Sequence, residues 1–313
     1  MIMNNLNNTI TTIIPFYNNA ETLPVMLDSI LDGVLVPDEI ILIDDGSTDD
    51  SADIIKEYVK RYPAIQYYHQ EHKGVSAARN LGISLAKCTW ISFLDADDYI
   101  EPDMYEEMIK AVADGMCDGC ISGYFTHKDE IITSYTRLQS ETLLSNDILK
   151  AMFTDDTVRG FLVTKLFKAD IVKQYSFDEN IAMCEDLLFQ TRYFANNNLK
   201  YKYIPKAFYH YIQNVSSATS TRDFFSNGIF VYKPAFDKIG NIIKEDYVLD
   251  SYNSILEYSM YTLLKAYSEG DRRKRTSDQI RAMQKELKST PCKQKSKRRI
   301  AYQLAPILFS RFI

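Results

Sequence analysis

No run of 18 or more apolar residues occurs in the 313-residue sequence, and this absence excludes a membrane-spanning helix of ordinary length. The N-terminus begins Met-Ile-Met-Asn-Asn-Leu and has neither a basic nor an apolar segment, so we expect no secretory signal. Cysteines are few, and their odd number and wide scatter are typical of a reducing compartment. With 46% hydrophobic residues, the composition therefore favours a cytoplasmic globular protein with a large core.

Glycine-rich phosphate loops are also missing. No G-x-G-x-x-G follows the first predicted strand, which excludes a Rossmann dehydrogenase. The residues after that strand, Pro15–Asn19, include no Gly, Lys or Arg, which disfavours a nucleotidyltransferase. A net charge of −6 argues against nucleic acid as a partner. Cys117 and Cys120 form a lone C-x-x-C pair, for which buried thiols are favoured over a zinc site.

Positive charge is concentrated at the C-terminus. Residues 268–313 hold thirteen Lys and Arg against four Asp and Glu, which leaves a charge of −15 on the rest of the chain. A basic cluster at 293–299 precedes a mostly apolar segment, 300–309, that is too short to cross a bilayer. This pattern predicts a peripheral contact with an anionic membrane, at the inner face of the plasma membrane. Packing of this segment on the catalytic domain, or a dimer contact, are the alternatives.

The first half of the chain alternates between strand and helix signals. β-Branched and apolar runs predict strands over 9–15, 39–43, 65–69 and 89–94. Helical spacing predicts helices over 20–31 and 74–86, and a third that Ser47 or Thr48 caps and that ends near residue 60. Short links between these elements indicate an α/β fold with a doubly wound, mainly parallel sheet, whose ligands bind beyond the carboxyl ends of the strands.

The pattern weakens after about residue 114 and becomes helical beyond residue 223. We therefore predict an α/β domain over 1–220 and a helical C-terminal region with a basic tail over 221–313.

An acidic cluster, Asp95-Ala96-Asp97-Asp98, directly follows the strand predicted over 89–94. Three carboxylates in four residues repel one another unless a cation lies among them, and oxygen ligands suit Mg²⁺ or Mn²⁺. Asp95 and Asp97 lie two residues apart and can face the same ion. The alternative is a solvated acidic turn before the next helix.

Two further polar positions fall near the same edge of the predicted sheet. Asp45, in Asp-Asp-Gly-Ser at the end of the strand 39–43, can accept a hydrogen bond from a base N–H, or serve only as part of a helix cap. Arg79 can bind a phosphate or a base with its guanidinium, or be an ordinary exposed arginine.

In this order and spacing, the motifs resemble those of the family 2 glycosyltransferases, which have the GT-A fold. The resemblance covers about residues 9–215 and rests on the segments 13–18 with Glu21, 41–51, 74–82, 91–98, 165–167 and 184–189. It implies a metal-dependent, inverting transfer from a nucleotide sugar, UDP-hexose or UDP-N-acetylhexosamine. It also implies that 1–220 is a catalytic domain, in which about 1–115 binds the nucleotide sugar and about 116–220 the acceptor. The implied acceptor is a glycan or lipid-linked oligosaccharide of a bacterial surface polysaccharide such as capsule or O-antigen.

The resemblance also implies roles for single residues. It places the nucleotide-sugar contacts at Pro15, Tyr17, Glu21, Asp45, Arg79, Asp95 and Ala96. Tyr17 would stack on uracil, and Asp45 would bond its N–H. Asp97 of the D-x-D motif would bind Mn²⁺ or Mg²⁺, with His210 completing its shell.

Asp186 matches the family's general base, which takes the proton of the acceptor hydroxyl. Glu185 is the alternative base. One carboxylate serves this chemistry, whereas glycoside hydrolases need two. Val163-Thr164 stands where the family often has Trp-Gly, which puts an acceptor-stacking role there in doubt. A catalytically inactive relative that binds nucleotide sugar is the remaining alternative, and intact Asp95, Asp97 and Asp186 argue against it.

Overall fold

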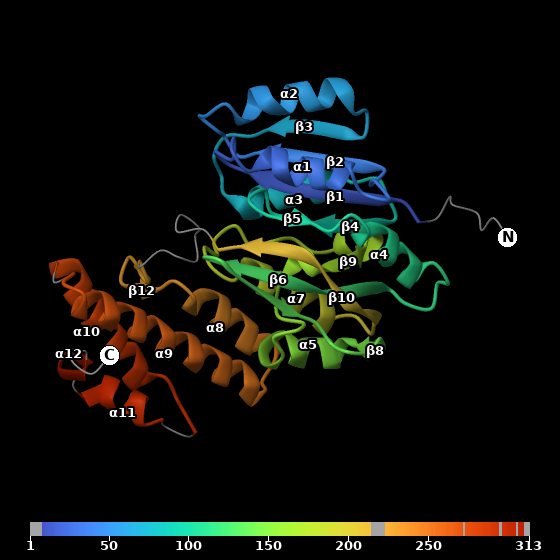
Figure 1. Cartoon of the computed structure of the whole chain (residues 1–313). Coiled ribbons are helices and arrows are strands. Elements are labelled where there is room, and N and C mark those ends of the chain that lie inside the picture. The colour runs from blue at the N-terminus through green and yellow to red at the C-terminus, as the bar shows by residue number, and fades with distance from the viewer. Residues whose placement is uncertain (1–7, 214–222, 272, 294–295, 305, 310–313) are drawn as a thin grey trace. The chain divides into compact units, whose positions relative to one another are not determined.

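The computed structural model describes residues 8–213, 223–271, 273–293, 296–304 and 306–309 (Figure 1). The chain forms two compact units. The first comprises Met1–Asn180 and Glu185–Gln213, and the second comprises Ile181–Cys184 and Asn214–Ile313. The boundary predicted at residue 220 lies outside the described residues.

Four parallel strands form the first half of the sheet in the order β3-β2-β1-β4. Their bounds are β1 Ile10–Phe16, β2 Glu39–Asp44, β3 Ile65–His69 and β4 Trp90–Phe93. The helices between them are α1 Leu23–Leu31, α2 Ser51–Arg61 and α3 Val75–Leu85. The predicted doubly wound α/β fold is therefore confirmed for this part of the chain.

The second half of the sheet is mixed. It contains β5 Tyr99–Ile100, β6 Gly119–Lys128, β7 Ile131–Tyr135, β8 Glu141–Leu144, β9 Lys165–Lys168 and β10 Lys200–Ile212. β9 runs antiparallel between β4 and β6, while β10 runs parallel to β6. Pro205 lies where the β6–β10 register shifts, between Ile204 and Ala207, because proline has no N–H to donate to the ladder.

Alternating side chains of the strands pack on opposite faces of the sheet. Ile14 and Leu42 belong to one buried cluster with Leu27 of α1 and with Met108 of α4 (Met104–Val112). On the other face α3 lies so close to β1 that a Cβ at its Gly82 would meet Ile13 Cγ2 at 2.4 Å. The sheet is thus the middle layer of three. The remaining helices of this unit are η2 Leu162–Thr164, α5 Ser145–Thr154, α6 Ala169–Val172 and α7 Glu185–Ala195.

The start of α2 differs from the prediction. The helix begins at Ser51, whereas Ser47 or Thr48 was expected to cap it. The backbone N–H of Ser47 donates to Asp44 Oδ1 at 2.7 Å, and that of Thr48 donates to Asn18 Oδ1 at 2.8 Å. Ser47 Oγ also accepts from the Asn18 N–H at 3.0 Å. Through Asn18, Ser47 and Thr48 therefore connect the loops after β1 and β2, and the helix starts after them.

The second unit is helical in its described residues apart from the short strands β11 Phe225–Ser226 and β12 Ile229–Phe230. Its helices are α8 Lys233–Ile242, α9 Asp246–Ser268, α10 Lys274–Ser289, α11 Lys297–Leu304 and α12 Pro306–Phe309. α10 ends at Ser289, two residues before Pro291. None of the helices described has the length and apolarity that crossing a membrane would take.

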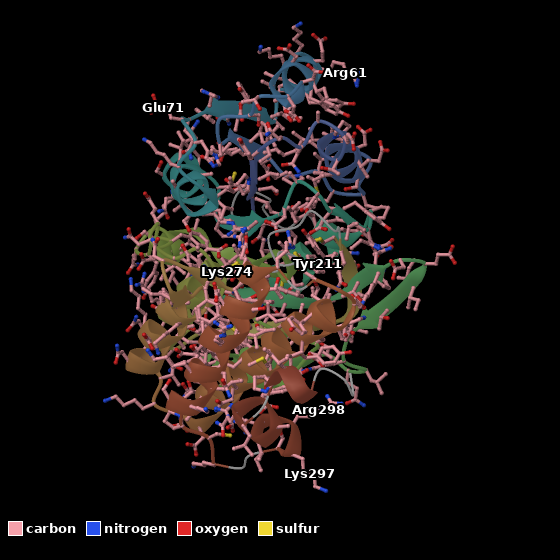
Figure 2. The ribbon with its side chains drawn as sticks, turned by 90° about the vertical axis from the view of Figure 1, so that its left-hand side faces the viewer. Arg61, Glu71, Tyr211, Lys274, Lys297 and Arg298 are labelled. Atoms are coloured by element: carbon pink, nitrogen blue, oxygen red, sulfur yellow. The ribbon has the colours of Figure 1, made fainter. Side chains whose placement is uncertain are left out.

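The basic tail is partly folded into this second unit. Arg299 of α11 is fully buried and donates from Nη2 to the carbonyls of Leu287 and Thr290 at 3.0 and 3.1 Å, at the C-terminal end of α10. Tyr302 is also buried. Lys297 and Arg298, by contrast, are exposed at the start of α11 (Figure 2). One face of this segment, with Arg299, therefore packs on its own unit, and Lys297 and Arg298 lie in solvent.

Candidate functional site

The predicted site residues follow three neighbouring strands. Tyr17 comes directly after β1, Asp45 after β2, and Asp95 shortly after β4. Because these strands are parallel, their carboxyl ends lie at the same edge of the sheet. Asn18, with φ 54°, accepts the Thr48 N–H and so ties the first of these loops to the second.

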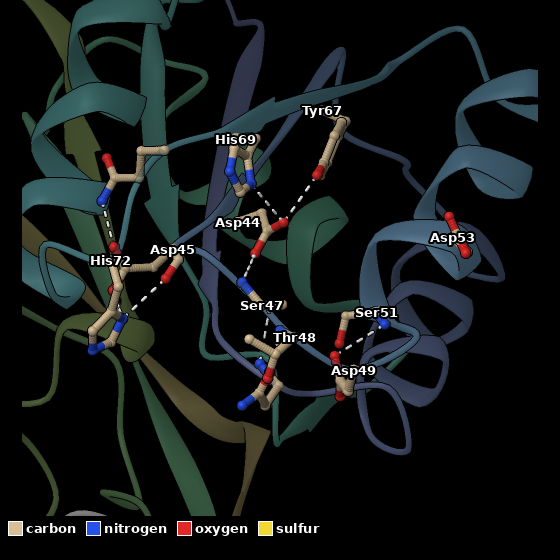
Figure 3. A network of polar contacts seen from close by, with 12 residues as sticks. Asp44, Asp45, Ser47, Thr48, Asp49, Ser51, Asp53, Tyr67, His69 and His72 are labelled. Carbon is tan, nitrogen blue, oxygen red and sulfur yellow. Dashed lines mark hydrogen bonds and ion pairs between the residues drawn. The ribbon is translucent and has the colours of Figure 1, made fainter.

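Asp45 is buried, and its carboxylate is bonded on every side to the loop after β3. Oδ1 accepts from Gln70 Nε2 at 2.6 Å and from the Lys73 N–H at 2.8 Å. Oδ2 accepts from the Gly74 N–H at 2.9 Å and lies 2.9 Å from His72 Nδ1 (Figure 3). Asp45 thus holds this loop in place. Its predicted bond to a base N–H stays a prediction, and a side chain such as Gln70 or His72 would have to give way to it.

His72 and Tyr17 form an exposed aromatic pair beside Asp45. Their ring centroids lie 4.4 Å apart with the planes tilted by 35°. Tyr17 is 43% exposed, so its ring is accessible from solvent. Gly46 permits this arrangement, because it has φ 80° and a Cβ there would lie 2.9 Å from the His72 backbone nitrogen.

The other two positions predicted in these loops lie nearby in sequence but differ in exposure. Pro15 is buried in β1 opposite Ile43 of β2, where it shapes the strand end. Glu21 is exposed in the turn before α1. Their predicted contacts with a nucleotide sugar remain predictions.

The acidic cluster after β4 has a graded environment. Asp95 is partly exposed, whereas Ala96 and Asp98 are buried. Burial and the charge of Asp95 raise the pKa of Asp97. Burial, followed by the charges of Asp97 and Asp95, raises the pKa of Asp98 to about 8, although Asp98 accepts bonds from the Tyr209 hydroxyl and the Ile212 N–H. The crowding of negative charge predicted from the sequence is therefore present.

Arg79 connects this cluster to α7. From α3 it donates through Nη2 to Asp95 Oδ1 at 3.0 Å and through Nη1 to Glu185 Oε1 at 2.8 Å. Its guanidinium is buried and lies 5.4 Å from the ring centroid of Phe177. The pKa of Arg79 is raised, since the neighbouring carboxylates outweigh the effect of burial. Arg79 is thus a fixed cation between the two acidic motifs.

Asp186, the predicted base, is the second residue of α7. Burial, together with the charge of Glu185, raises its pKa to about 7, while Arg79 opposes this shift. Its Oδ1 accepts the Leu187 N–H at 2.7 Å. A carboxylate with a pKa near 7 can accept a proton effectively at neutral pH.

His210 lies on β10 between the rings of Tyr99 and Phe125, with centroid distances of 4.1 and 4.5 Å. Its Nε2 is 2.8 Å from Glu101 Oε1, and its Nδ1 is 2.8 Å from His127 Nε2. Both ring nitrogens therefore have protein partners in this structure. Binding of a metal ion by His210 would require one of these contacts to break, and this role stays a prediction.

The side chains that would bind the predicted divalent cation are consequently Asp95 and Asp97. Across the ranges that the structure describes, no three His, Cys, Asp or Glu side chains are grouped to hold a metal by themselves. Two crowded carboxylates fit a cation that takes its remaining ligands from a substrate diphosphate, because such a cation relieves their repulsion. The residues present fit Mg²⁺ or Mn²⁺ on these terms.

Several residues of the site carried no role in the sequence interpretation. They are Gln70, His72, Phe177 and Lys165. Lys165 had a recognisable signal, since it is the one charged residue in the otherwise apolar stretch Gly160–Phe167. The bonds of Gln70 and His72 to Asp45 had no such signal, because polar loop residues are common.

Comparison with known proteins identifies the class. The profile of Glycosyl transferase family 2 matches residues 11–175. EpsH of Bacillus subtilis (strain 168) is 29% identical over 249 residues, which cover 75% of this chain and 71% of that protein. YibD of Escherichia coli (strain K12) is 28% identical over 252 residues, covering 78% and 72% respectively. Both carry glycosyltransferase in their names.

The fold also matches a solved structure. S. aureus TarS 1–349 in complex with UDP-GlcNAc superimposes with a TM-score of 0.66 over 97% of this chain and 87% of that one, at 17% sequence identity. This likeness shows a shared GT-A architecture. The chain belongs to glycosyl transferase family 2, and it is a glycosyltransferase.

Proposed function

We propose that this enzyme is an inverting transferase that uses a UDP-sugar, with UDP-hexose or UDP-N-acetylhexosamine as donor. The observation that carries the proposal is the environment of Asp186. Its carboxylate has a pKa near 7 and is connected, through Glu185 and Arg79, to Asp95 of the D-x-D motif. A base and a diphosphate-binding motif so coupled are the two parts that inverting transfer needs. The TarS structure with UDP-GlcNAc supports the choice of a UDP-linked donor.

Each part of the reaction has a residue in this arrangement. Tyr17 offers its exposed ring for stacking on the uracil, and Asp45 keeps the adjoining loop in place. Asp95 and Asp97 would hold Mg²⁺ or Mn²⁺, which supplies charge neutralisation for the leaving diphosphate. Asp186 takes the proton of the attacking acceptor hydroxyl, and this attack inverts the anomeric carbon.

The acceptor in this proposal is a glycan or a lipid-linked oligosaccharide used in surface polysaccharide synthesis. The exposed Lys297 and Arg298 support a peripheral contact with an anionic membrane, which would bring the enzyme to a lipid-linked acceptor. Such a contact places the enzyme in the cytoplasm, at the inner face of the plasma membrane.

A donor screen with a base variant tests the proposal. Purified protein is incubated with UDP-glucose, UDP-galactose, UDP-GlcNAc and UDP-GalNAc in the presence of Mg²⁺ or Mn²⁺, and the released UDP is measured. We expect release from at least one donor, and a fall of roughly 10²–10⁴-fold in Asp186→Asn, which keeps the size of the side chain but accepts no proton. UDP affinity should be unchanged in this variant.

The same screen separates the alternatives. If UDP binds but no donor turns over, the chain is a nucleotide-sugar-binding relative without activity. If Asp186→Asn keeps a normal rate while Glu185→Gln does not, the base is Glu185. NMR of the product gives its anomeric configuration. Retention of the donor's configuration would overturn the inverting mechanism.

A further inference from the structure

A buried lysine lies close to the predicted base. Lys165, the first residue of β9, is fully buried in the described structure. Its Nζ donates to three backbone carbonyls, those of Phe161 at 2.6 Å, Arg159 at 3.1 Å and Val158 at 3.4 Å. The three carbonyl oxygens take up the three N–H donors of an ammonium.

The three carbonyls belong to one turn, 158–161, that the lysine draws together. Arg159 has φ 39°, a conformation that side-chain-bearing residues rarely adopt. Such a strained turn persists only where its surroundings hold it, and the three bonds from Lys165 do so. The ammonium therefore fixes the shape of the turn.

The turn 158–161 also contacts the first residues of α7. A Cβ at Gly160 would meet Leu187 Cδ1 at 2.5 Å, so the turn packs directly on the residue after Asp186. Gln190 Nε2 donates to Gly160 O at 2.5 Å and to Asp186 O at 3.2 Å. Gln190 is fully buried and joins the turn to the backbone of the base itself.

From this geometry we infer that Lys165 is a positioning residue for the glycosyl-transfer base: through the turn 158–161 and Gln190 it fixes the first turn of α7, which carries Asp186. The inference rests on the proposed role of Asp186. It adds a residue that acts through the base and touches neither donor nor acceptor.

The charges around Asp186 agree with this role. Glu185 and Asp95 disfavour its ionised form, and Arg79 favours it. Burial lowers the pKa of Lys165 to about 7, and the negative charge of Asp186 opposes that shift. Arg79 favours the ionised form of Asp186 directly, and Lys165 is a second cation whose charge is coupled to that of Asp186. Arg79 is already bonded to Glu185 and Asp95.

The test compares pH profiles of UDP release in two variants. Lys165→Met keeps the volume but removes the charge. We expect kcat at pH 7 to fall about tenfold and the acidic limb of the profile to move up by about 0.5–1 pH unit, because loss of a cation raises the pKa of a nearby carboxyl. Gln190→Met removes the bonds to Gly160 and Asp186 but no charge, so kcat should fall several-fold with the acidic limb unmoved.

UDP affinity, measured by calorimetry, should stay within about twofold of wild type in both variants, since neither residue faces the donor. Lys173→Met is the matched control, because Lys173 Nζ also donates to a backbone carbonyl, that of Ala86 at 2.7 Å. It should change neither kcat nor the profile.

The outcomes separate this inference from the proposed function. If Asp186→Asn is inactive but Lys165→Met keeps the wild-type kcat and acidic limb, Lys165 has no positioning role and the function stands. If Asp186→Asn keeps full activity, both fail. Should Lys165→Met not fold, Gln190→Met decides, and an unchanged kcat in that variant overturns the inference.

Discussion

Arg79 Nη1 donates to Glu185 Oε1 across 2.8 Å, although 106 positions separate the two residues in the sequence. Since the same guanidinium holds Asp95, one buried cation joins the start of α7 to the acidic cluster after β4. The proposed base and the proposed diphosphate-binding motif are therefore joined by bonds between protein side chains, without any substrate.

Replacing Arg79 should affect both stability and turnover. Arg79→Met leaves Glu185 and Asp95 without their cation, and loss of one partner of a buried pair costs about 3–5 kcal/mol. Because Asp95 is 37% exposed, we expect about 3 kcal/mol, and about half of that for Arg79→Lys, which keeps one bond. Urea denaturation measures this loss in the free energy of unfolding. Equal unfolding midpoints for wild type and Arg79→Met would show that the ion pairs of Arg79 contribute nothing to stability.

Asp97→Asn should abolish metal-dependent UDP release. It keeps the shape of the side chain but removes one of the two carboxylates that fit a divalent cation, so we expect a fall of at least about 10²-fold with the fold retained. Circular dichroism checks the fold. Asp103→Asn, at an ion pair with Lys206, is the control and should keep the wild-type rate. Full activity in Asp97→Asn, or in excess chelator, contradicts a metal site here.

The aromatic pair of Tyr17 and His72 should contribute to the affinity for UDP. Tyr17→Ala should weaken UDP binding about tenfold or more, because stacking of a base on an aromatic ring contributes about 1–3 kcal/mol. His72→Ala should have a smaller effect, since it removes a neighbour of the Tyr17 ring and one contact of Asp45 but leaves the Tyr17 ring itself in place. Calorimetry with UDP gives both values. Tyr258→Ala, which removes a 69% exposed ring of the helical unit, should leave UDP affinity unchanged. Equal UDP affinities in Tyr17→Ala and Tyr258→Ala would show that the uracil does not stack on Tyr17.

Asp44 predicts a pH-dependent contribution to stability. Burial would raise its pKa, but the bonds from Ser47, His69 and Tyr67 together lower it below 3.8 (Figure 3). A carboxyl whose pKa is lowered in the folded state stabilises the fold above its unfolded pKa, and this contribution is lost as the pH falls through the folded pKa. Asp44→Asn should therefore cost about 2 kcal/mol at pH 7.

That cost should shrink as the pH falls from about 4, the pKa of the unfolded carboxyl, through the lower pKa of the folded one, where the wild-type Asp44 becomes protonated. Urea denaturation at several pH values measures the difference. Asp53→Asn, at an exposed pair with Lys56, is the control and should change stability by no more than about 0.5 kcal/mol at any pH. A constant deficit across the pH range would mean that the charge of Asp44 is not the source of the stability.

Membrane contact should depend on the exposed basic residues of α11. The double variant Lys297→Glu, Arg298→Glu should lower co-sedimentation with anionic vesicles at low salt more than tenfold, since each Lys or Arg near such a surface contributes about 1 kcal/mol. Removal of the whole tail is a poorer test, because Arg299 and Tyr302 are buried in the helical unit. Lys56→Glu, Lys60→Glu on α2 is the matched control. If the wild-type protein ignores anionic vesicles, α11 has only a structural role.

The local signals in the sequence were sufficient for the first half of the fold. The apolar runs at β1, β2, β3 and β4 and the spacing in α1 and α3 predicted these elements within one to three residues of their observed ends. The parallel arrangement followed from their alternation, and it brought Tyr17, Asp45 and Asp95 to one edge. β9 escaped prediction because its four residues carry no periodic pattern, and its antiparallel insertion depends on partners 70 and more positions distant in β4.

By itself, then, the sequence determined the class of fold, the order of its motifs and the acidic character of the site, since hydrophobic periodicity and runs of like charge act between neighbours in the chain. Only the tertiary structure decided which donor meets which acceptor. In the folded protein the Asp45 carboxylate is bonded to Gln70 and the loop after β3, and Arg79 is bonded to Glu185. The two ring nitrogens of His210 are bonded to Glu101 and His127. The tertiary structure also buried Lys165 beneath a turn. Such pairings depend on packing between elements far apart in sequence, where burial makes an unpaired charge costly and so selects the partners.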